Sequence, residues 1–476
     1  MQLRTNALAA VSALALSACA TGPVEVASTI APAATAGPFL SAESGTVTAN
    51  PLPADWWRMY EDPVLDGLVA DALAANTDIR QAAARIDRAR AALRGARADR
   101  LPDAGLSASA GYARTPAAQT LPGADRTGGA FSIGADVSYE VDLFGRVSGG
   151  ISAARGDLAA ARADADAVRV MVVADTTRAY ADAASAAARA EVARGIVRLL
   201  DDSLRLTQRR HDAGLSDGLA VARIEALRNQ RAATIPAIEA QRSAAVFALA
   251  TLTGRTPSQL PAISGERSVP LEIAAPLPVG DGAQLLARRP DVRAAEQRLL
   301  ADNARIGVAR ADLYPRITLG ASVGSSASSI GNLFSGGPIG FLLGPLIDWA
   351  FPNREPVRAR IDAASADAAG SLAAFDGTVL TALQETEAAL SAYARAVEQR
   401  RVLVAAVEAA SRAARITRAK NRQGVIDSLQ TLDAERTLAE AQSALSDQDA
   451  FVSQRQIGLF RALGGGWSGT AAESPT

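Results

Sequence analysis

The feature that most constrains the fold is that the sequence repeats itself at half its length. The segments Asn76–Gly111 and Arg289–Gly324 align without gaps at an offset of 213 residues, and both contain Ala-Arg-Ala-Asp ahead of a proline. A second pair, Arg210–Ala226 and Lys420–Arg436, aligns at an offset of 210. Because a unit of about 210 residues far exceeds a solenoid repeat, we interpret the halves as pseudo-symmetric parts of one architecture.

Both halves follow one plan: an opening helix, two strands, a very long helix, a tight glycine turn and a return helix. Proline is absent between Pro122 and Pro236 and between Pro356 and Pro475. The segment Val147–Ala213 therefore predicts a helix of about 100 Å. The aligned turn and return-helix positions are Gly214/Gly424, Asp217/Asp427, Leu219/Leu429, Glu225/Glu435 and Gly254/Gly464.

The long helices are expected to pack as coiled coils, because apolar residues recur at seven-residue spacing. The recurring residues are Leu383, Leu390, Val397 and Val404, then Leu438, Leu445, Val452 and Leu459. A return helix over Asp217–Thr253, placed end to end with an opening helix, matches one long helix in length. A pillar of this kind is favoured over a soluble helical bundle, whose helices are much shorter.

Strand signals follow each opening helix. In Phe131–Asp142 apolar and polar residues alternate throughout, which predicts a strand with one apolar face. Leu106–Arg114 and Arg316–Gly324 alternate more weakly, and the fourth strand, around Ile339–Trp349, hardly alternates. Such strands suit a membrane barrel, with lipid outside and a polar lumen, although a soluble sheet with one solvated face has the same pattern.

Tyr112, Tyr139 and Trp349 are candidates for an aromatic girdle of that barrel. Four strands cannot close a membrane barrel, because the smallest has eight. Two chains would give eight strands and an interior filled by side chains, whereas three give twelve and leave room for solute. An open channel therefore favours a trimer, with a twelve-stranded barrel joined to an α-helical tunnel.

The beginning of the chain has the features of a secretion signal. A positive charge at Arg4 precedes the apolar run Ala7–Leu16, which is too short to span a bilayer. Leu16-Ser17-Ala18-Cys19 resembles the lipobox of bacterial lipoproteins, and Cys19 is the single cysteine. The resemblance implies that the chain is cleaved before Cys19, that Cys19 is covalently lipidated, and that the protein is localised to the outer membrane. Several acyl chains would anchor the protein stably.

Composition argues against other classes of protein. The net charge is −1, which gives no electrostatic footprint for nucleic acid. With one histidine and one cysteine, a His/Cys metal site is excluded. His211 stands at the predicted end of a helix, where a cation is an ordinary structural choice. Carboxylates form no recognisable catalytic arrangement, so we expect no enzyme, no metal site and no cofactor besides the lipid.

Several motifs together support a family resemblance. They are DWWRMYEDPVLDGLV from Asp55, YEVDLFGR from Tyr139, GLSDGLAVARIEA from Gly214, TIPAIEAQRSAAVFALATLTGRTP from Thr234 and RRPDVRAAE from Arg288. The chain resembles the NodT branch of the TolC/OprM outer-membrane efflux factors. The resemblance implies a homotrimer, an equatorial region formed by Arg255–Pro290 with the N-terminal segment, a periplasmic adaptor, and an inner-membrane transporter of the proton-driven RND class.

The resemblance also implies functional positions. The adaptor-docking tips would contain Gly214, Ser216 and Asp217 in the first copy, and Gly424 and Asp427 in the second. A closed constriction would lie on the second return helix, where Leu429, Asp433 and Arg436 fall on one face. The first copy has Arg223 where the second has Asp433. Leu429 packing and Asp433–Arg436 pairing between subunits are the expected sources of closure.

We therefore expect a passive outer-membrane conduit for drugs and small solutes, gated at its periplasmic tip. A conduit of the same fold for protein secretion is the alternative. A periplasmic adaptor is disfavoured because it lacks long strands with an apolar face. The expected domains are a signal peptide (1–18), a lipid anchor and linker (19–52), the first repeat (53–263), the second repeat (264–465) and a flexible tail (466–476).

Overall fold

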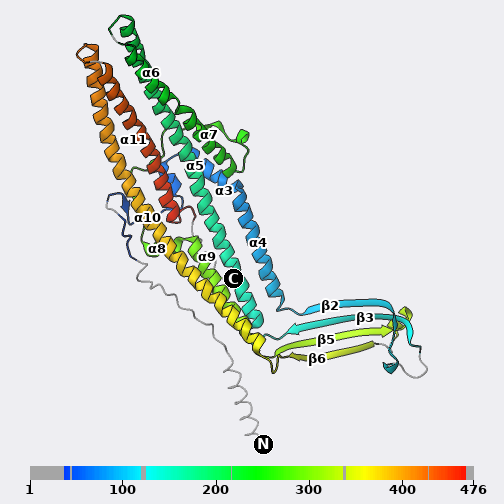
Figure 1. The fold of residues 1–476 in the computed structure, drawn as a ribbon. Helices are drawn as coiled ribbons and strands as arrows, with labels where there is room; N and C mark the ends of the chain where they lie inside the picture. The colour runs from blue at the N-terminus through cyan, green and yellow to red at the C-terminus, as the bar shows by residue number, and fades with distance from the viewer. Residues whose placement is uncertain are drawn as a thin grey trace. The chain divides into compact units, whose positions relative to one another are not determined.

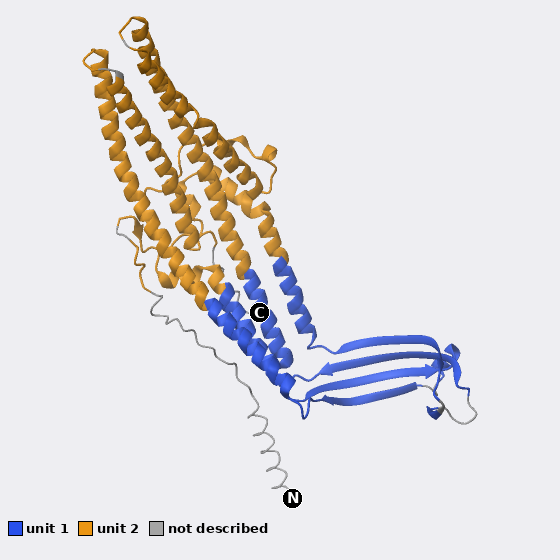
Figure 2. Cartoon of the chain, viewed as in Figure 1, with its two compact units in different colours: residues 1–28, 85–162, 294–375 blue, residues 29–84, 163–293, 376–476 orange. Residues whose placement is uncertain are grey.

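The computed structural model describes residues 37–42, 45–119, 125–215, 217–335, 339–426 and 428–467. Cys19, Ser216 and Asp427 lie outside the described residues. The described chain forms two compact units, shown in different colours in Figure 2. The sheet unit comprises 85–162 and 294–375, and the core unit comprises the remaining described residues. Each unit takes segments from both sequence repeats.

The sheet unit contains a four-stranded antiparallel sheet in the order β2-β3-β5-β6 (Figure 1). Its strands are β2 (Asp103–Arg114), β3 (Thr127–Glu140), β5 (Arg316–Ala327) and β6 (Ile339–Asp348). Each repeat supplies one hairpin, and β3 of the first pairs with β5 of the second. All four predicted strands are confirmed, including the weakly patterned fourth.

The strand register gathers the apolar residues of all four strands on one face. Leu106, Ala135, Val323 and Phe341 are successive partners across the sheet. The other face has mainly serine, glycine and acidic residues, but β6 places Leu342 and Leu346 there. These two leucines explain why the fourth strand hardly alternates. Directly paired residues lie on the same face of an antiparallel sheet, so the apolar face is continuous.

Two helices of unusual length follow the hairpins, α5 (Arg146–Asp212) and α10 (Glu355–Arg422). Their proline-free sequences allow unbroken backbone hydrogen bonding over 67 and 68 residues. The predicted span Val147–Ala213 is confirmed to within one residue at each end. None of the described helices is both long enough and apolar enough to cross a membrane.

The expectation of one continuous opening helix per repeat was wrong, because each is divided by a single extended residue. In the first copy Asn76 separates α3 (Pro63–Ala75) from α4 (Thr77–Ala98). In the second, Arg289 separates α8 (Gly282–Arg288) from α9 (Pro290–Ala311). Pro290 disfavours helical backbone in the preceding residue, which explains the second break. In the first, the Asn76 side chain accepts hydrogen bonds from the backbone N–H groups of Asp78 and Ile79 and caps a new helix.

The return helices differ between the copies, although both were predicted to be continuous. The second is one helix, α11 (Ser428–Ala462). The first is divided into α6 (Gly218–Ala232) and α7 (Ile235–Leu252). Pro236 lies in the first turn of α7 and has no N–H to continue the helical ladder, so the prediction of continuity was wrong for this copy.

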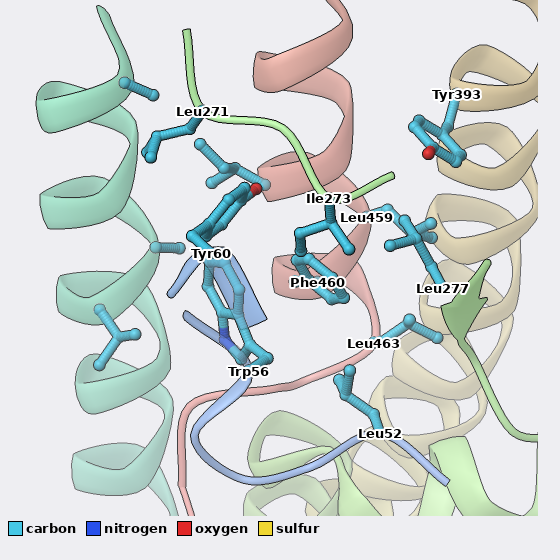
Figure 3. Packing of buried hydrophobic residues seen from close by; sticks show 14 of the residues in the cluster. Leu52, Trp56, Tyr60, Leu271, Ile273, Leu277, Tyr393, Leu459, Phe460 and Leu463 are labelled. Atoms are coloured by element: carbon cyan, nitrogen blue, oxygen red, sulfur yellow. The ribbon is translucent and has the colours of Figure 1, made fainter. Parts of the chain in front are cut away.

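The main hydrophobic core lies in the core unit and joins distant parts of the sequence (Figure 3). Trp56 is fully buried and stacks on Phe460 of α11, with 4.6 Å between ring centroids. Nearby, β1 (Val47–Thr48) pairs in parallel with β4 (Leu277–Pro278). The N-terminal segment and the stretch after α7 therefore pack together. These are the segments expected to form the equatorial region, whose place in an assembled channel stays a prediction.

Candidate functional site at the helical tips

Both hairpins of the core unit turn through glycine with left-handed backbone. Gly214 has φ +74° and Gly424 has φ +75°, a region that other residues rarely adopt. Leu215 N donates to Arg210 O at 2.7 Å, and Val425 N donates to Lys420 O at 3.0 Å. These bonds close a Schellman motif at the end of each long helix. The predicted turns at Gly214 and Gly424 are thus in place.

The residue after each tip glycine exposes an aliphatic side chain, Leu215 by 76% and Val425 by 67%. A groove of 740 Å³ lies between the tips and is lined by both residues, with Leu219 and Leu429. Asp217 borders the groove and caps α6 by accepting from Ala220 N at 2.9 Å. No role was expected for Leu215, Leu219 or Val425. For Leu215 and Val425, an aliphatic residue directly after each tip glycine was a usable signal.

The two hairpins are bound to each other just behind the tips. The Arg210 guanidinium of α5 donates to the side-chain oxygen and the backbone oxygen of Asn421 on α10, both at 2.8 Å. Asn421 is buried and donates in turn to Ile426 O at 3.3 Å. One arginine therefore ties the end of the first long helix to the second tip.

The predicted constriction residues share the exposed face of α11. Leu429 is 52% exposed, and Asp433 and Arg436 are exposed on the following turns. Arg436 Nη2 lies 2.9 Å from Asp433 Oδ1 of the same helix. A spacing of three residues on one helix places the two charges within reach of each other. The expected pairing between subunits stays a prediction. The Asp433 charge is thus already partly balanced within one chain.

Glu435 faces the opposite way and holds α11 to its own chain. It is buried, accepts from Ser203 Oγ of α5 at 2.8 Å and from Arg418 Nε of α10 at 3.1 Å. Glu435 is aligned with Glu225 in the repeat, and no role was predicted for it. Since Glu225 is exposed, no signal in the repeat distinguished the two. The candidate gate helix therefore has one face held to α5 and α10 and another face exposed.

A duplicated chain with two very long helices and a four-stranded sheet defines the class of TolC-like outer-membrane channels. The sequence profile described as outer membrane efflux protein matches residues 68–255 and 282–465, once in each repeat. The chain belongs to this family.

Individual relatives agree with the assignment. The chain is 31% identical to the probable efflux pump outer membrane protein TtgC of Pseudomonas putida, covering 96% of this chain and 95% of TtgC. It is 32% identical to outer membrane protein OprJ of Pseudomonas aeruginosa, over 87% and 86% of the two chains. A solved structure of the outer-membrane channel OprN superposes with a TM-score of 0.86 at 33% identity, covering 94% of this chain and 99% of that one. The VceC outer membrane protein of Vibrio cholerae gives a TM-score of 0.80 at 27% identity, covering 88% and 100%.

These findings make the chain the outer-membrane channel of an efflux pump. Membership in a family of channels also means that it is not an enzyme. The fold and the functional class expected from the sequence are confirmed, as is the location in the outer membrane.

Proposed function

We propose that three copies of this chain form one conduit, with their sheets closing a twelve-stranded barrel and their helices forming a periplasmic tunnel. The observation that supports this most directly is that β2 and β6 are the two open edges of a sheet with a continuous apolar face. Long unpaired edges present free backbone donors and acceptors, which cannot remain unpaired in lipid. Pairing β6 of one copy with β2 of the next removes every edge, and three copies leave an open lumen.

The proposed cargo is drugs and small apolar solutes that pass through without chemical change. Support comes from relatives named as an antibiotic efflux pump protein, ArpC, and a toluene efflux pump protein, TtgC, each 31% identical to this chain. The partners would be a periplasmic adaptor, docking in the groove between Leu215 and Val425, and an inner-membrane transporter of the RND class. The exposed aliphatic residues of that groove suit the apolar side chains of an adaptor hairpin.

We further propose that Cys19 has a lipid anchor, as in the NodT branch. The described residues begin at position 37. In this segment the backbone N–H groups of Leu40 and Ser41 donate to Glu387 at 2.7 and 2.8 Å. Glu387 would thus fasten the linker to α10. Cys19→Ser should abolish incorporation of labelled palmitate, whereas Glu387→Gln should leave it unchanged. Equal labelling of Cys19→Ser and the wild type contradicts the anchor.

The proposed gate is the face of α11 formed by Leu429, Asp433 and Arg436. At a three-fold axis three carboxylates ~6 Å apart repel by about 0.7 kcal/mol per pair in water. Pairing of Arg436 with Asp433 in the same helix reduces this repulsion. Closure then comes mainly from contacts among the Leu429 side chains, and adaptor docking at the tips would separate them.

One set of experiments tests the conduit and its gate. Native mass measurement in detergent should give three chains, and single-channel recordings should show conductance. Asp433→Cys should crosslink between subunits with a short reagent, whereas Arg223→Cys, the aligned position of the first copy, should not. Leu429→Ala with Asp433→Ala should raise conductance and weaken cation selectivity. A conducting monomer contradicts the shared barrel. If Asp433→Cys never crosslinks and the alanine pair conducts like the wild type, the gate lies elsewhere.

A further inference from the structure

An aromatic cluster with a cation stands where β6 ends in the sheet unit. Trp349 and Phe351 stack with 5.2 Å between ring centroids and an interplanar angle of 26°. The Arg354 guanidinium carbon lies 5.2 Å from the Trp349 centroid and 6.0 Å from the Phe351 centroid. Trp349 Nε1 donates to Leu313 O at 3.2 Å, which fixes the ring. The cluster is therefore a preformed surface rather than a set of free side chains.

The cluster is open to its surroundings and continuous with the apolar face of the sheet. Trp349 is 44% exposed and Phe351 is 68% exposed. Trp349 comes two residues after Ile347, an exposed member of the apolar face. Stacked aromatic rings and an adjoining apolar strand would cover the acyl chains of a lipid, and tryptophan is typical of the boundary between hydrocarbon and headgroups.

Arg354 differs from the arginines around it in its charge balance. In the part of the chain that the structure describes, no carboxylate lies within ion-pair distance of Arg354. Its neighbours Arg358 and Arg360 are paired with Glu355 and Asp312, respectively. At the matching end of the first hairpin, Arg146 makes two hydrogen bonds to Glu140, at 2.6 and 2.5 Å.

The available guanidinium therefore suits an anion. Its paired N–H groups match the oxygens of a phosphodiester. Asp348, which ends β6, is exposed and stays outside ion-pair range of Arg354. Because water screens the exposed Asp348 carboxylate, it would repel an anionic ligand only weakly.

We propose that Trp349, Phe351 and Arg354 bind the headgroup of an anionic phospholipid of the phosphatidylglycerol class from the periplasmic leaflet. This inference rests on the proposed function, since the sheet must span the membrane for the strand ends to lie at headgroup depth. Charged residues cluster at this same end, where the Glu140–Arg146 and Arg360–Asp312 pairs lie. The phosphate would contact the guanidinium, and one acyl chain would lie along Phe351 and Ile347.

The test uses the full-length protein in nanodiscs with equal amounts of phosphatidylglycerol and phosphatidylcholine of matched chains. Native mass spectra should show phosphatidylglycerol retained preferentially by the wild type. Arg354→Gln should lower its retention about fivefold, because one basic side chain contributes about 1 kcal/mol at an anionic surface. Arg358→Gln, one turn further along α10 and already paired, is the matched control and should retain the wild-type amount. Trp349→Leu should also lower retention.

Three results would overturn the lipid site. They are equal retention of both lipids by the wild type, unchanged retention in Arg354→Gln, and loss of the trimer in Arg354→Gln, which would make the cluster a contact between subunits. Mass and conductance of the same samples separate the two proposals. A conducting wild-type trimer without lipid preference contradicts only the lipid site, whereas a wild type that neither assembles nor conducts contradicts the proposed function and the lipid site with it.

Discussion

The two repeats use different side chains at the same position, the extended residue that divides each opening helix in two. We call this position the joint of each repeat. In the first copy Asn76 Nδ2 donates to Leu252 O at the end of α7, at 2.9 Å. In the second, Arg289 Nη1 donates to Ala462 O at the end of α11, also at 2.9 Å. Arg289 is aligned with Asn76 and Ala462 with Leu252, at the two offsets of the repeat. The backbone arrangement has persisted through the duplication, while the group that satisfies the carbonyl has changed.

The glycines beside these joints show the same persistence. Gly254 and Gly464 have φ +66° and +68°. The N–H of the residue after each glycine donates five residues back, from Arg255 to Ala250 at 2.8 Å and from Gly465 to Phe460 at 3.0 Å. The comparison teaches that turns and helix ends preserve the duplicated plan. The two copies differ in side chains on α11, such as Asp433 and Glu435. The candidate gate therefore lies in the second copy.

The largest difference in stability between the two copies is expected when a methyl group is added to each of these glycines. A Cβ at Gly254 would lie 2.6 Å from the backbone oxygen of Ala75, whereas one at Gly464 would lie 3.2 Å from the Arg289 side chain. Gly254→Ala should therefore cost about 2–5 kcal/mol, from left-handed backbone strain and an overlap that no rotamer relieves. Gly464→Ala should cost about 1–2 kcal/mol, mostly strain. Guanidinium unfolding followed by helical circular dichroism measures both, and an equal or larger cost at Gly464 contradicts the expectation.

The second comparison uses variants that remove the side chain at each joint, Arg289 in the second copy and Asn76 in the first. Arg289 also binds Asp291 at 2.7 Å and Glu385 at 2.9 Å. Burial by itself would lower the pKa of Arg289, but its hydrogen bonds to Asp291 and Glu385 raise it, so the group stays charged. Arg289→Ala should cost about 2–3 kcal/mol, because two carboxylates and a carbonyl lose a charged donor.

Asn76→Ala is the matched variant of the first copy. It removes a helix cap and one donor and should cost about 1–2 kcal/mol. Both values come from the same denaturant series, with Arg289→Lys as a control that keeps the charge but not the forked geometry. If Asn76→Ala proves the more damaging of the two, the added ion pairs of the second copy contribute little.

Sequence reasoning predicted most of the architecture because its signals were local or repeated. The absence of proline predicted the long helices, and glycine positions predicted the tips. Pro290 and Pro236 were visible signals of the breaks that the prediction overlooked. The break at Asn76 was harder to predict, because asparagine also occurs within helices. Its capping hydrogen bonds can be identified only from the structure.

The candidate site was predicted less completely, because it depends on contacts between distant segments. Spacing placed Leu429, Asp433 and Arg436 on one face, and the structure exposes all three. Burial of Glu435 could not be predicted, since its partners Ser203 and Arg418 are on two other helices. Pairing of Asp433 with Arg436 in the same helix was not predicted, although their spacing of three residues was a signal for it.

The third comparison concerns the aligned pair Glu435 and Glu225. Glu435→Ala removes the acceptor shared by Ser203 and Arg418 and should cost about 1–2 kcal/mol. The loss should be local, so hydrogen exchange of α11 amides near Glu435 should quicken while the exchange of α7 stays unchanged. Glu225→Ala, at an exposed position, should shift neither. Equal exchange in both variants would show that Glu435 does not hold the gate helix.

The smallest expected effect distinguishes the starts of the two long helices. Asp142 accepts from Val147 N at 3.0 Å and Ser148 N at 2.8 Å near the start of α5. Ahead of α10, Asn353 accepts from Glu355 N at 3.2 Å. Burial alone would raise the pKa of Asp142, but hydrogen bonds from Ser148 and Val147 outweigh it and lower the pKa below 3.8. The charged form is thus favoured in the folded state.

The stabilisation from Asp142 should therefore be present above pH 3.8, the ordinary value, and be lost as the pH falls through the lower folded pKa. Asp142→Asn keeps an acceptor and should flatten this part of the pH profile with little change at pH 7. Asp142→Ala should cost about 1 kcal/mol at pH 7. Asn353→Ala should cost no more than that and should leave the acid slope as in the wild type, because Asn353 does not titrate. Unfolding midpoints measured between pH 7 and pH 3 decide the matter: an unchanged acid slope in Asp142→Asn would mean that the carboxylate charge at this cap adds nothing beyond its hydrogen bonds.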